Sequence, residues 1–246
     1  MRHERTRLFP ASHITIADNG YLDGGLHTRN HVPIGASRIE LRRRAAVHRN
    51  RRSAGIFHAA SEIDRDVFVK AEQMINGFKE YFISHNEVVY DNPSPGNKQG
   101  GITTLEDKSC GCVQKGGSAP IMDVIDYGEP VTTKGLNMLY GPGNDLVSAT
   151  ALTAAGAHMI LFSTGRGTPF GAPAPTLKIA TNSQLAAKKS TWIDFNAGVV
   201  ADGEKTLDEA GADLYQLVLD VASGKQTCAE KKGFREISIF KDGVVL

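Results

Sequence analysis

The sequence predicts an α/β fold in which helices cover both faces of a largely parallel sheet, a Rossmann-like three-layer arrangement. Short β-like apolar runs alternate with helical or loop stretches through the second half of the 246 residues. The last helical stretch has a single apolar stripe, which is typical of a helix packed on a core. With 41% hydrophobic and 22% charged residues, the chain has the composition of an ordinary globular protein.

Two helices are expected ahead of this alternation. Apolar residues recur at helical spacings between Ser61 and Asn86, and no proline interrupts them. A second helix opens at Thr103 and reaches about Lys115, where a pair of glycines stops it.

The alternating region supplies the strands and the remaining helices. The strand-like runs are Leu136–Tyr140, Met159–Ser163, Thr176–Ala180, Trp192–Phe195 and Ile237–Phe240. The helical stretches include Asp145–Ala155 and Thr206–Ala222. The latter begins with a capping box formed by Thr206 and Glu209, and Gly224 follows its end.

Charge divides the chain into two parts. Residues 1–55 hold eleven arginines, no lysine and four acidic residues, so they carry +7 in a chain whose total charge is +1. We therefore expect a basic, poorly ordered remnant segment over 1–55 and a single α/β region over 56–246. The cluster from Arg42 to Arg52 would attract nucleic acid, but it lacks interleaved aromatic residues and a reading motif, so we predict no nucleic-acid partner.

Composition also predicts the cellular compartment. No apolar run approaches the roughly 20 residues needed to span a bilayer, and the polar start lacks the apolar segment of a secretory signal. The three cysteines argue against a secreted disulfide framework. Cys110 and Cys112 stand closer together than zinc ligands usually do, which favours a structural role. We expect a cytoplasmic protein with no membrane partner.

The segment from Asn92 to Glu106 combines turn residues with a lysine and a helix start. Prolines and glycines define its turns, and Thr103 with Glu106 forms a capping box. Backbone N–H groups at that helix start, with Lys98 beside them, would attract an anionic ligand. A well-capped surface turn is the alternative.

Two glycine-rich loops follow predicted strands, at the position where parallel sheets bind ligands. The first spans Gly141–Asp145 and the second spans Thr164–Gly171; neither contains a nucleotide-binding motif. The second places Arg166 between two glycines, so its guanidinium could bind a carboxylate in bidentate geometry. An Arg166 salt-bridged to the fold is the alternative.

Five ordered segments resemble the altronate and galactarate dehydratase family. They are Asn92-Pro-Ser-Pro-Gly-Asn-Lys-Gln-Gly-Gly-Ile-Thr-Thr-Leu-Glu-Asp-Lys108, Gln114-Lys-Gly-Gly117, Phe162-Ser-Thr-Gly-Arg-Gly-Thr-Pro-Phe-Gly171, Leu177-Lys-Ile-Ala-Thr-Asn182 and Trp192-Ile-Asp-Phe-Asn-Ala-Gly198. The resemblance runs from about Ile63 to the C-terminus and looks most like the altronate branch. The glycine-rich middle section that family members have is missing, so we expect a truncated or internally deleted member, or the product of a disrupted coding frame.

The resemblance implies a hydro-lyase. Such an enzyme removes water from a hexonic sugar acid, with D-altronate as the expected substrate, to give a 2-keto-3-deoxy acid in hexuronate catabolism. An inactive fragment, a sugar-acid-binding remnant, a galactarate dehydratase and a sulfolactate lyase relative are the alternatives. The family implies a divalent metal, Fe²⁺ or alternatively Mn²⁺, that would stabilise charge on the substrate carboxylate. The partner is the small-molecule sugar acid, and a homo-oligomer is left open.

Site residues follow from the matched motifs. The candidate catalytic residues are Lys98, Glu106, Lys108 and Arg166, of which Glu106 has an equally good structural explanation in its capping box. The candidate substrate-binding residues are Gly96, Asn97, Gly101, Thr164, Gly165, Gly167, Thr168, Lys178, Asn182 and Asn196. The metal ligands are unknown; Asp194 is a candidate ligand, and hydrogen bonding to a sugar hydroxyl is its alternative role.

Overall fold

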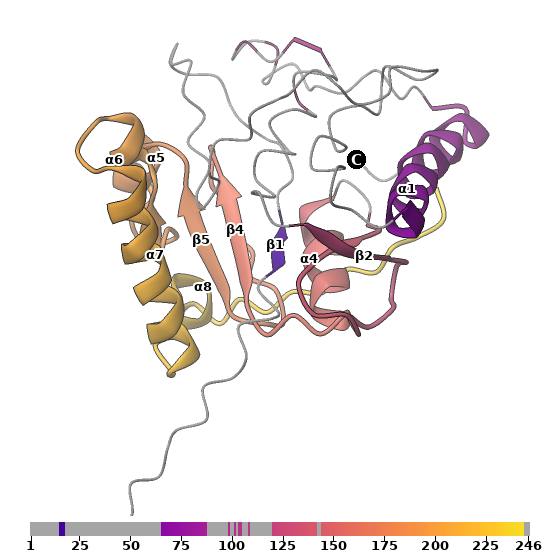
Figure 1. Cartoon of the computed structure of the whole chain (residues 1–246). Coiled ribbons are helices and arrows are strands. Elements are labelled where there is room, and N and C mark those ends of the chain that lie inside the picture. The colour runs from indigo at the N-terminus through magenta and orange to yellow at the C-terminus, as the bar shows by residue number, and fades with distance from the viewer. Residues whose placement is uncertain are drawn as a thin grey trace, which may run out of the picture.

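A computed structural model shows a mixed α/β fold with small parallel sheets, which confirms the predicted fold class at that level (Figure 1). The structure describes residues 15–17, 65–87, 98, 101, 103–104, 108, 120–141 and 144–243. Among the helices in these residues, none combines the length and the apolar character needed to cross a membrane.

The main sheet has four strands in the order β1-β4-β5-β6, and every neighbouring pair is parallel. Its strands are β1 (Thr15–Ala17), β4 (Ile160–Thr164), β5 (Thr176–Ala180) and β6 (Phe195–Asn196). All five residues of β5 are buried, as expected for a strand covered on both faces.

The remaining strands form a separate two-stranded parallel sheet, which corrects the prediction of one sheet. It pairs β2 (Ile121–Ile125) with β3 (Leu136–Leu139), and the register shifts between Ile121 and Asp123. Helix α1 (Arg65–Ser84) contacts β2, and Lys70 Nζ donates to Asp123 Oδ1 at 3.0 Å. Because α1 covers β2, this small sheet has its own packing partner.

The two faces of the main sheet pack against different helices (Figure 1). On one face Ile160 and Phe162 of β4 share a buried cluster with α4 (Asp145–Ala154). On the other face Leu161 packs with Leu214 and Val218 of α7 (Leu207–Ala222). The alternation along β4 follows the two-residue period of a strand.

Three short helices complete the described part. They are α5 (Ser183–Lys188), α6 (Gly198–Ala201) and α8 (Cys228–Lys231). The Thr206–Glu209 capping box predicted for α7 is confirmed, and α8 starts with a second box, Thr227 and Glu230, that the sequence analysis did not use.

Several predicted elements have close counterparts among the described residues. The helix expected between Ser61 and Asn86 is α1, and it ends where Asn86 adopts a left-handed φ of 58°. Glu87 N donates to Phe82 O at 3.0 Å, the closing bond of a Schellman motif. Of the helix expected from Thr103 to about Lys115, the structure describes Thr103, Thr104 and Lys108, and Lys108 N donates to Thr104 O at 3.2 Å.

Two strand predictions were wrong in part or in full. The run Trp192–Phe195 forms a strand only at its end, where β6 begins at Phe195. The run Ile237–Phe240 forms no strand. Its N–H groups bond to side chains: Ser238 N donates to Thr150 Oγ1 and Phe240 N donates to Tyr127 Oη, both at 3.1 Å.

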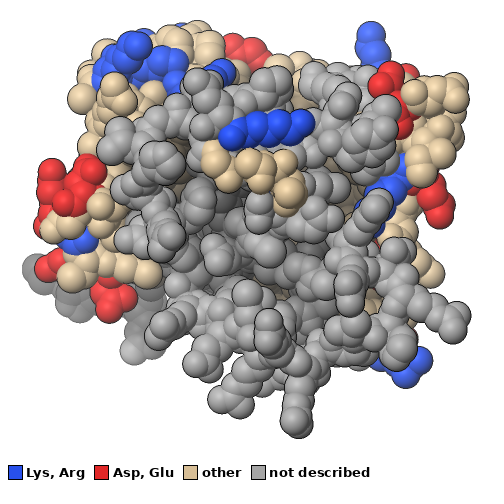
Figure 2. Space-filling model, turned by 90° about the horizontal axis from the view of Figure 1, so that it is seen from above, with Lys and Arg blue, Asp and Glu red and all other residues tan. Residues whose placement is uncertain are grey.

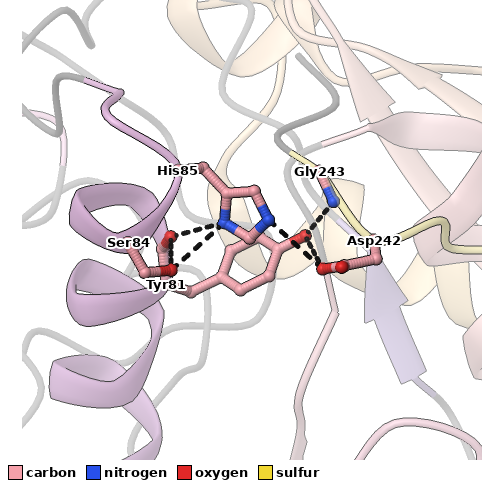
Figure 3. Close-up of polar contacts among 5 residues, drawn as sticks. All are labelled: Tyr81, Ser84, His85, Asp242 and Gly243. Carbon is pink, nitrogen blue, oxygen red and sulfur yellow. Dashed lines mark hydrogen bonds and ion pairs between the residues drawn. The ribbon is translucent and has the colours of Figure 1, made fainter.

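The C-terminal segment returns to the end of α1 (Figure 3). Gly243 N donates to Tyr81 Oη at 2.6 Å, and Tyr81 Oη donates to Asp242 Oδ1 at 3.4 Å. His85 Nε2 lies 3.3 Å from the same Asp242 oxygen. The two Tyr81 bonds join residues that are separated by 161 and 162 positions.

Within the expected basic segment 1–55, the structure describes only Thr15–Ala17, as strand β1. This strand, which the sequence analysis did not predict, pairs with β4 from Thr15 opposite Ile160 to Ala17 opposite Phe162. The rest of the segment, with the cluster Arg42–Arg52, lies outside the described residues, as do Cys110 and Cys112. The proposed boundary at residue 55 stays a prediction.

Candidate functional site

The carboxyl ends of three neighbouring strands lie at one edge of the main sheet. Thr164 of β4 pairs with Ala180 of β5, and Ala180 pairs with Asn196 of β6. The segments that follow these residues therefore begin side by side, which is the usual ligand-binding position in a parallel sheet.

The glycine-rich loop after β4 has a defined backbone. Gly167 N donates to Thr164 Oγ1 at 2.9 Å, and Gly167 has a φ of 75°. A Cβ at Gly167 would lie 3.1 Å from Leu185 Cδ1 and from Lys189 Cδ. Glycine is needed here because the backbone is left-handed and also lies close to α5.

Side chains from the two ends of α5 hold this loop. Asn182 Nδ2 donates to Gly165 O at 3.1 Å, while its Oδ1 accepts from Leu185 N and caps α5. Lys189 Nζ donates to Arg166 O at 2.7 Å and to Gly167 O at 3.2 Å. The Arg166 residue itself is exposed.

Lys178 anchors the loop at Thr168 from inside the protein. This residue is 1% exposed, and its Nζ donates to Thr168 O at 2.5 Å. Burial lowers the pKa of Lys178 to about 8, against the opposing effect of Asp194 and Glu236, whose charges raise it. The contact predicted between Lys178 and a sugar hydroxyl stays a prediction, since the described partner of this amine is a backbone carbonyl.

Asp194 joins β5 to α8. Its Oδ2 accepts from Lys178 N at 2.8 Å and its Oδ1 accepts from Cys228 N at 2.7 Å. Burial, with Asp194 nearby, raises the pKa of the Cys228 thiol and disfavours the thiolate that would bind a metal. Among the described residues, no group of three His, Cys, Asp or Glu side chains is placed to hold a metal ion. These residues do not fit a metal site, and the Asp194 ligand assignment stays a prediction.

Asn196 shapes the junction between α5 and α6. Its Nδ2 donates to Ser183 Oγ at 2.9 Å and its Oδ1 accepts from Gly198 N at 2.9 Å. A Cβ at Gly198 would lie 2.2 Å from Ser183 N, so no side chain fits there. Asn196 thus stands at the same sheet edge as the Thr164–Thr168 loop, with both amide atoms bonded within the protein.

The residues from the first glycine-rich segment are described in part. Lys98 is exposed and its carbonyl accepts from Gly101 N at 3.1 Å, with Gly101 at a φ of 95°. Lys108 is half-buried. Gly96, Asn97 and Glu106 lie outside the described residues. A site shared by Lys98 and Arg166 stays a prediction.

Sequence reasoning missed Lys189, which contacts two loop carbonyls. Its bonds cross 22 and 23 positions, and no local motif marks such a contact. The one available signal was Asn182, a preferred N-cap residue that predicts a helix leading toward Lys189.

Charged side chains are interspersed on the described surface when the molecule is seen from above (Figure 2). Basic and acidic groups alternate around the rim of this view. Such mixing is typical of a solvated protein surface.

Comparison with known proteins assigns a family. Residues 56–245 match the family model described as D-galactarate/Altronate dehydratase, C-terminal. The chain is 56% identical over 183 residues to an altronate dehydratase of Escherichia coli (strain K12), and 52% identical over 183 residues to an altronate dehydratase of Bacillus subtilis (strain 168). It is 40% identical over 157 residues to the L-threo-forming galactarate dehydratase of Escherichia coli (strain K12).

These matches cover most of this chain but a minor share of its relatives. Each altronate dehydratase alignment covers 74% of this chain and 37% of the relative, and the galactarate dehydratase alignment covers 63% and 30%. The chain therefore corresponds to the C-terminal part of longer enzymes. The resemblance inferred from the motifs is confirmed, and the chain belongs to the D-galactarate/altronate dehydratase family through its C-terminal region.

Proposed function

We propose that this chain acts as a hydro-lyase on a hexonic sugar acid, with D-altronate as the preferred substrate and a 2-keto-3-deoxy acid as the product. The observation that carries the proposal is the exposed Arg166 on a loop whose backbone is held at the carboxyl edge of a parallel sheet. Identity of 52–56% to altronate dehydratases over 183 residues supports the same reaction class. A cytoplasmic location is the expected setting for this catabolic step.

The proposed reaction breaks two bonds and releases water. A base takes the C2 proton, and the electron pair moves toward the carboxylate as an enediolate. That pair then forms the C2–C3 double bond while the C3 hydroxyl leaves with a proton, and the enol tautomerises to the 2-keto acid. Arg166 is suited to bind the carboxylate through its planar fork and to stabilise the added negative charge.

The base is assigned to Lys98, with Glu106 and Lys108 as alternatives. Several candidate substrate-binding residues lie along the same edge of the sheet: Thr164, Gly165, Gly167, Thr168, Asn182 and Asn196. A requirement for Fe²⁺ or Mn²⁺ remains a proposal that the described donor atoms do not support, and no step is assigned to a metal. Metal analysis of the purified chain tests that requirement.

The second candidate function is binding of the sugar acid without turnover. It is favoured by one observation, that the chain spans 37% of the length of the altronate dehydratases it matches. Parts of the reaction machinery of those longer enzymes would then lie in sequence that this chain does not match.

One assay separates the two functions. The purified chain, supplied with Fe²⁺, is incubated with D-altronate and with D-galactarate, and 2-keto-3-deoxy acid is followed beside a full-length altronate dehydratase. Product from D-altronate supports the hydro-lyase. No product from either acid beside an active control removes that proposal, and calorimetric binding without product supports the second function.

A further inference from the structure

Four consecutive carbonyl groups of the loop after β4 accept hydrogen bonds from side chains. The acceptors are the carbonyl oxygens of Gly165, Arg166, Gly167 and Thr168. The donors are Asn182, Lys189, which serves two of them, and Lys178. All three donors come from residues 178–189, so a single segment around β5 and α5 supplies the side-chain donors to all four carbonyls.

Both lysines in this set also lie over an aromatic ring. Lys178 Nζ is 5.5 Å from the centroid of the Phe170 ring, and Lys189 Nζ is 4.7 Å from the centroid of the Trp192 ring. A cation over a ring face is attracted by the ring quadrupole. Each ammonium is therefore held between an aromatic face and the loop backbone, which limits where the loop can go.

We propose that Lys178 and Lys189 are positioning residues for the sugar-acid site, which hold the Gly165–Thr168 backbone so that the exposed Arg166 is presented to the substrate carboxylate. This inference deepens the proposed function and rests on it. The two lysines act through the loop and not by touching the reacting atoms.

The arrangement favours anion binding for two physical reasons. Carbonyl oxygens carry partial negative charge and would repel a carboxylate, whereas here four of them are taken up by N–H donors, three of the four bonds coming from ammonium groups. A backbone that is already ordered also loses little conformational entropy when the ligand binds. Removing one lysine should therefore weaken the site without removing Arg166.

Lys189 is the better test position because it is half-buried at the end of α5 and its neighbour offers a matched control. Lys188 is an exposed lysine in the last turn of the same helix. The variants Lys189→Met and Lys188→Met thus remove the same charge from adjacent positions, and only the first removes the bonds to Arg166 O and Gly167 O.

The first measurement is digestion of the full chain with an arginine-specific protease, followed by mass spectrometry of the cut between Arg166 and Gly167. Lys189→Met should be cut there about tenfold faster than wild type, because two charge-assisted hydrogen bonds are lost. Lys188→Met should be cut at the wild-type rate. Equal rates in Lys189→Met and wild type, or equal acceleration in both variants, would overturn the inference.

The second measurement is the affinity for D-altronate by calorimetry. It uses variants whose melting temperatures equal that of wild type. Lys189→Met should bind about tenfold more weakly, and Lys189→Arg should recover most of the affinity because it keeps the charge and the donors. Unchanged affinity in Lys189→Met would overturn the positioning role. An equal loss of affinity in Lys189→Arg would also overturn the positioning role, because arginine keeps the positive charge and the N–H donors that the loop carbonyls need.

Lys178→Met gives an independent check at the other end of the loop. Removing a buried ammonium need not unfold the chain, and loss of the bond to Thr168 O should again speed the cut after Arg166. Protease results stand whether or not the chain binds a sugar acid. If wild type neither binds nor converts D-altronate, the proposed function fails while the protease data still decide whether the lysines hold the loop.

Discussion

At the scale of single residues, Arg166 combines an exposed side chain with a backbone that is bonded on both sides. Arg166→Lys should lower kcat/KM for D-altronate by at least about tenfold, because a point ammonium cannot reproduce a bidentate fork. Steady-state kinetics with Lys188→Arg as the control checks this. Wild-type turnover in Arg166→Lys would show that the loop has a structural role only.

Lys178 makes protein stability depend on pH in a defined window. Its folded-state pKa, about 8, lies below the ordinary value of 10.5, so the unfolded chain holds the proton more tightly. Stability then rises as pH increases from about 8 toward 10.5, because the folded state no longer carries a buried charge.

Urea unfolding of wild type and Lys178→Met at pH 7 and pH 9.5 measures this effect. The free energy of unfolding of wild type should gain about 2 kcal/mol relative to the variant at the higher pH. A difference in the free energy of unfolding between wild type and Lys178→Met that is the same at both pH values would contradict the lowered pKa.

At the scale of elements, two glycines in similar helical settings have opposite expected responses. A Cβ at Gly198, at the start of α6, would meet Ser183 N at 2.2 Å, whereas a Cβ at Gly211, inside α7, has no heavy atom within 4 Å outside its own helix backbone. Gly198→Ala should lower the free energy of unfolding by roughly 1–3 kcal/mol through overpacking. Gly211→Ala should raise it by roughly 0.5–1 kcal/mol.

Chemical denaturation of both variants tests this contrast. Both variants replace glycine with alanine, so the effect of the replacement on the unfolded chain is the same and cancels when the two variants are compared. If Gly198→Ala leaves the free energy of unfolding unchanged, α5 and α6 can move apart without a loss of stability.

Elements with strong local signals could be predicted from the sequence. The capping box at Thr206 and the apolar stripe after it located α7, and the β-like run that forms β5 has the predicted bounds Thr176–Ala180. The run Ile237–Phe240 looks equally strand-like but forms no strand, and the N–H groups of Ser238 and Phe240 donate to the hydroxyls of Thr150 and Tyr127. No pattern within four residues can reveal partners so distant in sequence.

The candidate site likewise has a part that could be predicted from the sequence and a part that could not. A glycine-rich loop after a strand could be placed at the sheet edge from spacing alone, and Thr164 and Asn182 do stand there. The contacts of Lys189 and the burial of Lys178 depend on how α5 and α8 pack, which is tertiary information. Sequence therefore indicated where the loop lies but not what holds it.

At the scale of the whole molecule, the C-terminal segment fastens the end of α1 (Figure 3). Tyr81→Phe removes the acceptor for Gly243 N and the donor to Asp242, and it keeps the ring that lies 5.9 Å from Phe240 between centroids. The free energy of unfolding should fall by about 1 kcal/mol. Hydrogen exchange at the Gly243 amide should become faster.

A matched control for this variant is Tyr215→Phe, at a residue of α7 that is 58% exposed. Exposed substitutions of this kind change stability by less than about 0.5 kcal/mol. If Tyr81→Phe and Tyr215→Phe change the free energy of unfolding by the same amount, the contact between α1 and the C-terminal segment does not contribute to stability.

The side-chain bonds to the carbonyls of Gly165–Thr168 span only 10 to 23 positions along the chain, whereas the bonds of Tyr81 to Asp242 and Gly243 span 161 and 162. Closing a short stretch of chain costs less entropy than closing a long one. The Gly165–Thr168 backbone can therefore assemble early during folding, before the segment that contains Asp242 and Gly243 reaches α1.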